Sequence, residues 1–239
     1  MQDGAAPLTL TLHKAIAEIA ATDWDACAGA DNPFISHAFL SAVEDSGSAN
    51  ARTGWLPQHA VLHDAAGRVV AAAPMYAKAH SYGEYVFDHG WAHALERAGG
   101  DYYPKLQVAV PFSPVPGPRL LIRPGSGIPA AALAGALVQA CQELGTSSVH
   151  VTFCTEAEYG ALGETGWLQR LGVQFHWHNR GYGGFDDFLG ALSSRKRKVL
   201  RRERRDANAC GLEFVALRGP EIGRAQWDAF YDFYQSTVD

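Results

Sequence analysis

The sequence predicts an α/β protein in which a mixed sheet is flanked by helices and followed by a cationic helix and the opening of a second domain. Segments with strand periodicity and segments with helix periodicity alternate up to about residue 180, which is typical of an α/β domain. A hydrophobic content of 47 % over 239 residues is enough for a large core. From Phe185 the pattern changes to a helix rich in arginine and lysine.

The N-terminal part predicts one strand, two helices and a hairpin. Residues 8–12 alternate leucine with threonine, as a strand with one buried face would. Residues 16–29 are helical in pattern, and Asn32-Pro33 ends that helix. Ser36 is a suitable N-cap for the next helix. Residues 58–81 predict two strands joined by the turn Asp64–Gly67.

The rest of the chain continues the alternation. An aromatic, proline-rich and glycine-rich region separates two expected strands, and Pro129 suits the first turn of the helix that follows. Gly211 stands where the C′ glycine of the cationic helix would lie. The expected strands are 106–110, 119–122, 148–153, 173–179 and 212–217, and the expected helices are 129–144, 156–172, 185–210 and 220–239.

Composition and charge exclude several classes of protein. The formal net charge is −5, whereas DNA-binding domains are usually basic. The four cysteines are widely spaced without a CxxC pair, so neither a disulfide scaffold nor a cysteine metal site is expected. The N-terminus lacks the basic and apolar regions of a signal peptide, and no apolar run could span a bilayer. These features indicate a cytoplasmic protein.

Four segments carry a resemblance to a known family: FDHGWAHALERAGGDYYPKLQVAVPFSPVPGPRLL, SSVHVTF, QFHWHNRGY and LSSRKRKVLRRERR. In this order they resemble the FemAB-like branch of the GNAT acyltransferase superfamily, bacterial proteins of peptidoglycan biosynthesis or recognition. The resemblance implies a GNAT-like mixed sheet flanked by helices. It divides the chain into a first GNAT-like domain (1–183), a cationic linker helix (184–211) and the opening strand and helix of a second, incomplete GNAT-like domain (212–239).

The resemblance also implies a reaction class. Members of this group transfer an acyl or aminoacyl group to an amine, which here would belong to a cell-wall precursor or another small acceptor. The donor is either an acyl-CoA or an aminoacyl-tRNA, and no further cofactor is required. A non-catalytic recognition module that kept the GNAT fold is the alternative. The oligomeric state stays open.

The GNAT donor site is a glycine turn whose backbone N–H groups hold pyrophosphate. Here the corresponding residues read Ile-Arg-Pro-Gly-Ser-Gly, so Gly125 and Gly127 are the candidate residues for binding the donor. However, the arginine is one position late, and Pro124 removes one N–H donor. A plain turn between a strand and a helix is therefore the alternative.

The segments GEYVFDHGWAHA and YYPKLQVAVPFSP combine acids, bases and aromatic residues in loop-rich sequence, where sites are commonly found. Glu84 and Asp88 are the candidate catalytic residues, since either carboxylate could receive the proton of an acceptor amine. Carboxylates held in buried ion pairs would count against this assignment. The candidate substrate-binding residues in the same segments are His89, Trp91, Tyr102, Tyr103 and Lys105.

The run from Arg195 to Arg205 contains eight basic residues and one acidic residue. One interpretation is a structural helix with a solvated charged face. The other is a surface that binds the phosphates of a nucleotide-linked or lipid-linked acceptor, or of tRNA. DNA binding is not expected, because the rest of the chain is acidic. For the second interpretation the candidate substrate-binding residues are Arg195, Lys196, Arg197, Arg201 and Arg202.

Ten histidines raise the question of a metal site. His89 and His93 have the spacing that places two ligands on one helical face, but no third ligand completes the set. His176 and His178 flank Trp177 and belong to no cysteine or carboxylate cluster. His150 is expected to be a core histidine with its hydrogen bonds satisfied. The sequence therefore predicts no metal.

Overall fold

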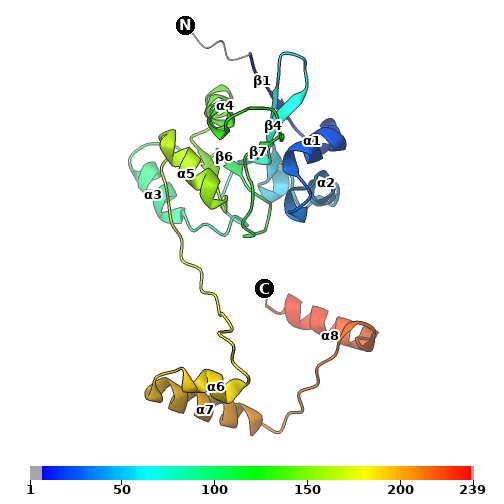
Figure 1. Ribbon diagram of the computed structural model, residues 1–239, viewed down its shortest axis with the longest axis vertical. Coiled ribbons are helices and arrows are strands. Elements are labelled where there is room, and N and C mark those ends of the chain that lie inside the picture. Colours follow the sequence, from blue (N-terminus) through cyan, green and yellow to red (C-terminus); the bar gives the residue numbers. More distant parts are fainter. Residues whose placement is uncertain (1–6, 238–239) are drawn as a thin grey trace. The chain divides into compact units, whose positions relative to one another are not determined.

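The computed structural model describes residues 7–237. The chain divides into two compact units, Met1–Leu171 and Gly172–Asp239, and each is described by itself. The first unit contains all the described strands (Figure 1). The second contains only helices and irregular segments. The domain limits expected from the sequence, after residues 183 and 211, stay predictions.

One antiparallel sheet of the first unit, sheet A, has the strand order β1-β3-β4-β7. The central strands form the predicted hairpin, whose turn is closed by a hydrogen bond from the Gly67 amide to the Asp64 carbonyl. The strand predicted at residues 8–12 is confirmed and lies at one edge of the sheet. The bounds are β1 Thr9–His13, β3 His59–His63, β4 Val69–Ala73 and β7 Leu121–Ile122.

The second sheet, sheet B, has the order β2-β5-β6-β8. Its last two strands are parallel, and its other pairs are antiparallel. Only Pro74 separates β4 from β5, so the chain passes directly from sheet A into sheet B. The predicted α/β class is confirmed, although the expected single mixed sheet is divided into two. The bounds are β2 Leu56–Pro57, β5 Met75–Lys78, β6 Lys105–Val108 and β8 Val149–Val151.

Two α-helices of the first unit begin at residues whose side chains cap them. The Ser36 side chain accepts a hydrogen bond from the Phe39 amide and starts α2, as expected. Thr155 and Glu158 form a capping box at the start of α5. The α-helices are α1 Ala21–Ala28, α2 His37–Asp45, α3 His89–Arg97, α4 Ala130–Glu143 and α5 Glu156–Glu164, and the 3-10 turns are η1 Ile16–Glu18, η2 Pro33–Ile35 and η3 Ala51–Thr53.

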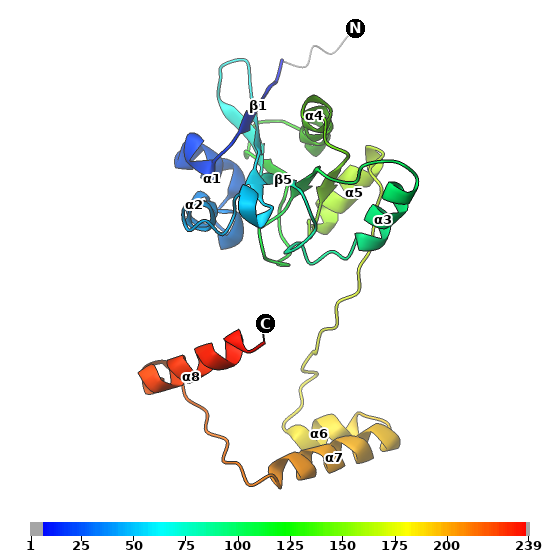
Figure 2. The ribbon, with the colours of Figure 1, turned by 180° about the vertical axis from the view of Figure 1, so that it is seen from behind.

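The helices pack on opposite faces of the sheets (Figures 1 and 2). α1 and α2 bury Trp24 and Leu40 against Val61 and Ala72 of sheet A. α4 and α5 cover the other face, together with the apolar face of sheet B. The separation follows from the alternation of side chains along each strand. Burying these apolar faces provides the main stabilisation of the unit.

In the second unit the expected helix over residues 185–210 is interrupted. It forms α6 Phe185–Gly190 and α7 Ser194–Asn208, because Ser193 caps a new helix by accepting a hydrogen bond from the Lys196 amide. The helix after residue 220 is confirmed as α8 Arg224–Gln235, preceded by the turn η4 Gly219–Glu221. The C-cap of α7 is Ala209, so the C′ position is Cys210. Gly211, which was predicted at C′, lies one position further along the chain.

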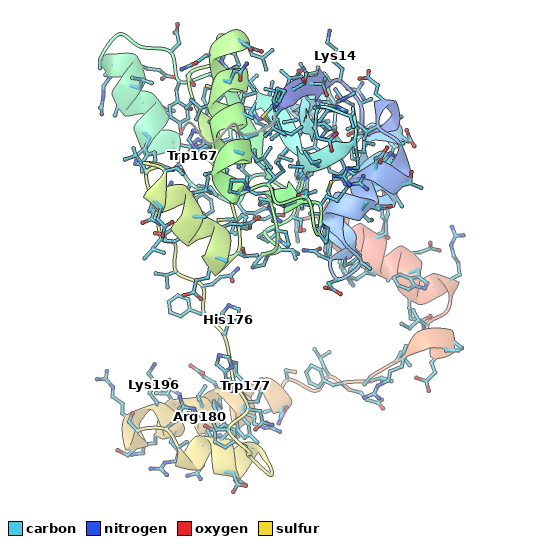
Figure 3. The ribbon with its side chains drawn as sticks, turned by 45° about the horizontal axis from the view of Figure 1, so that its top comes forward. Lys14, Trp167, His176, Trp177, Arg180 and Lys196 are labelled. Atoms are coloured by element: carbon cyan, nitrogen blue, oxygen red, sulfur yellow. The ribbon has the colours of Figure 1, made fainter. Side chains whose placement is uncertain are left out.

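Two strand predictions in the second unit are wrong. Residues 173–179 and 212–217 have no regular secondary structure. Figure 3 shows His176 and Trp177 on the extended segment before α6. Their alternation is that of a strand, but a strand also needs a partner whose backbone completes the ladder of hydrogen bonds. No helix among residues 7–237 is both long and apolar enough to cross a membrane.

Candidate functional site

Sheet B has one apolar face and one polar face. Met75, Leu106 and Val108 point into the core. The alternate positions, Tyr76 and Lys78 on β5 and Lys105 and Gln107 on β6, carry the polar side chains. All four are fully buried. Polar groups in such a position must find partners within the protein.

Two lysines stand directly opposite each other on this polar face. Lys78 pairs with Lys105 in the register of β5 and β6. Two like charges opposite each other in a sheet repel, so the pair needs nearby counter-charges. Glu84 and Asp88, from the segment that follows β5, supply them. We call Lys78, Glu84, Asp88 and Lys105 the buried charge cluster.

Lys105 is the centre of the buried charge cluster. Its Nζ donates hydrogen bonds to Glu84 Oε2 at 2.8 Å, Asp88 Oδ2 at 2.6 Å and Ser81 Oγ at 3.0 Å. These bonds use all three N–H donors of the ammonium group. Tyr102 donates a further hydrogen bond to Asp88 Oδ2 at 2.8 Å. One lysine therefore fixes three residues of the loop 79–88.

Lys78 is less completely bonded. Its Nζ donates to the Tyr82 carbonyl at 3.1 Å and lies 3.6 Å from the ring centroid of Trp55. Glu84 Oε1 is 4.0 Å away, which is an ion pair but not a hydrogen bond. Burial lowers the pKa of Lys78 to about 8, against the opposing effect of Glu84.

The two carboxylates differ in their proton affinity. Burial alone would raise the pKa of Asp88, but the hydrogen bonds from Lys105 and other neighbours outweigh burial and lower it to about 2. Burial raises the pKa of Glu84, although Lys105 opposes the shift. Glu84 is thus the stronger base of the two.

The structure brings five of the predicted site residues together: Glu84, Asp88, Tyr102, Tyr103 and Lys105. Tyr103 shares a hydrogen bond with Ser81 at 2.8 Å. Both carboxylates are held in buried ion pairs, which counts against the prediction that they act as freely accessible acids or bases. Asp88 also occupies the N-cap of α3 without capping it, because its carboxylate is turned toward Lys105.

His89 and Trp91 lie apart from the buried charge cluster, in exposed positions on α3. Several aromatic side chains of the preceding loop 79–88 are exposed as well, and the ring centroid of Tyr82 lies 6.1 Å from that of His89. Tyr82 is 70 % exposed and Phe87 80 % exposed. Tyr85 adopts the left-handed backbone conformation with φ of 56°. The aromatic surface is defined as Tyr82, Tyr85, Phe87 and Trp91.

The side chains of the loop 79–88 thus fall into two groups. Ser81, Glu84 and Asp88 point inward and are bonded to Lys105, while the aromatic residues between them point outward. Inward anchoring restricts the conformations that the loop can adopt. The aromatic surface is consequently presented on a fixed support.

The predicted glycine turn lies between β7 and α4. Gly125 and Gly127 both have positive φ, at 75° and 70°. The Arg123 guanidinium is engaged, since it donates to Asp23 Oδ1 at 2.8 Å and to the Val69 carbonyl. Pro129 occupies the N-cap of α4 and offers no N–H. These features are those of a plain turn, and phosphate binding here stays a prediction.

The predicted anion-binding residues lie on α7. Among residues 7–237, the only ion pair made by a cation of α7 joins Arg205 to Asp206 at 3.4 Å. The Lys196 side chain extends away from the helix (Figure 3). A shallow groove of about 350 Å³ between α6 and α7 is lined by Phe185, Arg201 and Arg204 among others. A second groove of about 450 Å³ is lined by Arg195, Lys198, Val199, Arg201, Arg202 and Arg205.

Arg197 differs from the other cations of α7. It is partly buried, whereas Arg195, Lys196, Arg201 and Arg202 are exposed. Leu189 of α6 is fully buried, and Leu200 of α7 is partly buried. The predicted packed face of α7 is thus only partly buried, since Val199 is exposed and no residue of α7 is fully buried.

His150, expected as a core histidine, is half-buried on the polar face of edge strand β8, with Ser148 Oγ 2.8 Å from its Nε2. Burial, assisted by Lys105, lowers its pKa to about 4. In the part of the chain that the structure describes, no three His, Cys, Asp or Glu side chains could hold a metal ion.

His150 should make the protein sensitive to acid. Its folded-state pKa is lowered below the ordinary value of 6.5, so between pH 6.5 and 4 the unfolded chain binds the proton more readily. Stability should therefore fall as the pH drops through this range. In His150→Gln the loss of unfolding free energy between pH 7 and 4 should be smaller by up to about 3 kcal/mol. Denaturant unfolding at pH 7, 6, 5 and 4 would measure it. An unchanged difference between pH 7 and 4 would contradict this.

Trp55, Lys78 and Ser81 were not among the site residues predicted from the sequence. A signal for Lys78 was present, because MYAK and KLQV both alternate polar with apolar residues and thereby place Lys78 and Lys105 on one face. Their pairing could not be read from the sequence, because the register between β5 and β6 crosses a long intervening segment. Trp55 and Ser81 gave no comparable signal.

The sequence matches the family described as FemAB-like, peptidoglycan biosynthesis/recognition, over residues 15–239. Glucosamine-6-phosphate N-acetyltransferase from Arabidopsis thaliana is a similar solved structure, with 6 % identity, a TM-score of 0.39, and coverage of 72 % of this chain and 98 % of that chain. AtaT complexed with acetyl-methionyl-tRNAfMet has 13 % identity, a TM-score of 0.37, and coverage of 70 % and 91 %. At these TM-scores neither structure adds to the family match. None of the curated proteins matches the sequence.

Proposed function

Since the chain belongs to the FemAB-like family of peptidoglycan biosynthesis/recognition, we propose that it is an N-acyltransferase that moves an acyl or aminoacyl group to an amine. The acceptor is a cell-wall precursor or another small molecule. The amine nitrogen attacks the acyl carbonyl carbon, the bond from that carbon to the donor sulfur or oxygen breaks, and the amine proton passes to a base.

The observation that carries the proposal is the loop 79–88. Lys105 fixes its inward carboxylates, and the loop turns the aromatic surface outward. Aromatic rings on a fixed support suit the apolar faces of a sugar or the side chains of a peptide. The acceptor therefore binds against Tyr82, Tyr85 and Trp91, with His89 beside them.

Glu84 is the proton acceptor in this proposal, and Asp88 is a positioning residue. Glu84 has the raised pKa and one carboxylate oxygen, Oε1, without a hydrogen-bond partner. Asp88, with a pKa of about 2, is too weak a base. Glu84 becomes accessible only when the loop 79–88 moves, because its side chain is 1 % exposed.

The cationic face of α7 binds the phosphates of the donor or of the acceptor. Arg195, Lys196, Arg201 and Arg202 lack carboxylate partners among residues 7–237, so their charge is available to a ligand. The donor is an acyl-CoA or an aminoacyl-tRNA, both of which carry phosphate. The reaction takes place in the bacterial cytoplasm.

The test is a thermal-shift and transfer assay with acetyl-CoA, other acyl-CoAs and charged tRNA. We expect one donor to raise the melting temperature, and Arg201→Glu with Arg202→Glu to weaken its binding at least tenfold. Arg68→Glu with Arg97→Glu, two exposed arginines of the first unit, is the matched control. Glu84→Gln should abolish transfer while leaving donor binding intact. Stabilisation by none of the donors would reject acyl transfer.

A non-catalytic recognition module is the second candidate. The ion pairing of both carboxylates favours it, because neither faces solvent. In that case peptidoglycan fragments would still bind the aromatic surface, and Tyr82→Ala or Trp91→Ala would weaken binding without any transfer being detected. The same assay therefore separates the two candidates.

A further inference from the structure

Phe112 packs against Trp55, whose indole lies among incompletely hydrogen-bonded polar groups. Its ring centroid lies 5.5 Å from that of Trp55. A Cβ atom placed on Gly83 would lie 2.7 Å from the Phe112 ring and 3.2 Å from Trp55 Nε1. The Phe112 ring and the indole nitrogen therefore both lie against Gly83, and only glycine at position 83 leaves room for them.

Three polar groups at or near Trp55 are incompletely hydrogen-bonded. Trp55 Nε1 and Glu84 Oε1 are buried and make no hydrogen bond. Lys78 Nζ makes one hydrogen bond, to the Tyr82 carbonyl, although an ammonium group has three donors. Lys78 Nζ lies within 4.0 Å of both Glu84 Oε1 and the Trp55 ring centroid. Unpaired buried polar groups are costly, so a ligand that bonded them would gain their full interaction.

The Phe112 side chain does not have the features of a permanently buried core residue. Its side chain is 43 % exposed, and its backbone has φ of 54°, a conformation that non-glycine residues rarely adopt. Strain of this kind is concentrated at ligand clamps and switch regions. Rotation of the exposed ring would uncover the indole N–H without disturbing the apolar face of sheet B.

We propose that Trp55, Lys78 and Glu84 form a subsite for a carboxamide group, and that Phe112 closes it. The Trp55 N–H and the Lys78 ammonium group donate to the carbonyl oxygen of the ligand. Glu84 Oε1 accepts from its N–H. A carboxamide offers this pairing of acceptor and donor, whereas a simple anion would be repelled by Glu84 and a simple cation by Lys78. The subsite does not depend on acyl transfer.

The test follows the indole N–H signal of Trp55 by ¹⁵N NMR, assigned with Trp55→Phe. Phe112→Ala should speed its solvent exchange at least tenfold and let acetamide shift the signal at lower concentration than in the wild type. Phe87→Ala removes a more exposed aromatic ring, which is 80 % exposed against 43 % for Phe112, and should change neither. Unchanged exchange and acetamide response in Phe112→Ala would overturn the closing role of Phe112.

Two further comparisons test the chemistry of the subsite. N,N-dimethylacetamide lacks the N–H for Glu84, so it should bind Phe112→Ala several-fold more weakly than acetamide. Adding Glu84→Leu, which removes the acceptor oxygen, should abolish most of that preference, and circular dichroism confirms that each variant is folded. Equal responses to the two amides would overturn the role of Glu84. None of these readouts requires enzymatic activity, so failure of the subsite and failure of the proposed function are distinguishable.

Discussion

Lys105→Met should lower the free energy of unfolding of the first unit by about 3–5 kcal/mol, as removal of one partner from a buried ion pair typically does. The methionine fills a similar volume but provides no N–H. Glu84 and Asp88 then remain buried with less counter-charge, and Ser81 loses its hydrogen bond from Nζ. Denaturant unfolding followed by tryptophan fluorescence would measure the loss.

Two variants make this expectation specific. Lys14→Met removes an exposed lysine of the same unit, which projects from the surface (Figure 3), and should cost less than about 0.5 kcal/mol. Lys105→Met combined with Asp88→Asn removes one charge of each sign and leaves the Lys78–Glu84 pair. This double variant should be more stable than Lys105→Met alone. A loss in Lys105→Met no larger than in Lys14→Met would show that the buried charge cluster does not stabilise the fold.

Arg119→Met should cost a similar amount, about 3–5 kcal/mol, for a different reason. Arg119 is fully buried and donates only to backbone carbonyls. Its Nε bonds the Thr152 carbonyl at 3.0 Å, and its two Nη atoms bond three carbonyls of the preceding loop, those of Val115, Gly117 and Pro118. The substitution leaves four acceptors without this donor and releases the loop from the end of β8. Thermal or denaturant unfolding would measure the loss.

The matched control is Arg97→Met on the exposed surface of α3, which should change the unfolding free energy by less than about 0.5 kcal/mol. Arg119→Lys tests the geometry, because an ammonium group cannot reproduce the planar fork of a guanidinium. It should therefore rescue little of the loss. Full stability in Arg119→Lys would mean that charge, and not the pattern of hydrogen bonds, is what the site requires.

Local sequence patterns were sufficient to predict most of the helices and strands of the first unit. Ser36 predicted the start of α2, the turn at Asp64–Gly67 predicted the hairpin, and Pro129 predicted the start of α4. Each depends on contacts within a few residues. The same reasoning was wrong for residues 173–179 and 212–217, because alternation predicts a strand only when another strand is available to pair with it.

The candidate site could be predicted only in part. Loop-rich sequence with acids and aromatic residues pointed to the segment around Glu84 and to Tyr102. It did not show which side chains face inward. Glu84 and Asp88 were expected to be candidate catalytic groups, but the structure holds them against Lys105. The direction of each side chain depends on the path of the loop, which no local pattern specifies.

The sequence by itself determined the α/β class, the order of most elements and the cationic face of α7, because periodicity, capping and charge are local properties of the chain. Only the tertiary structure decided that Lys78 stands opposite Lys105, that Glu84 and Asp88 neutralise them, and that Phe112 covers Trp55. These contacts join residues far apart in the sequence. They form because burying two lysines is tolerated only where counter-charges and hydrogen-bond partners arrive from other segments.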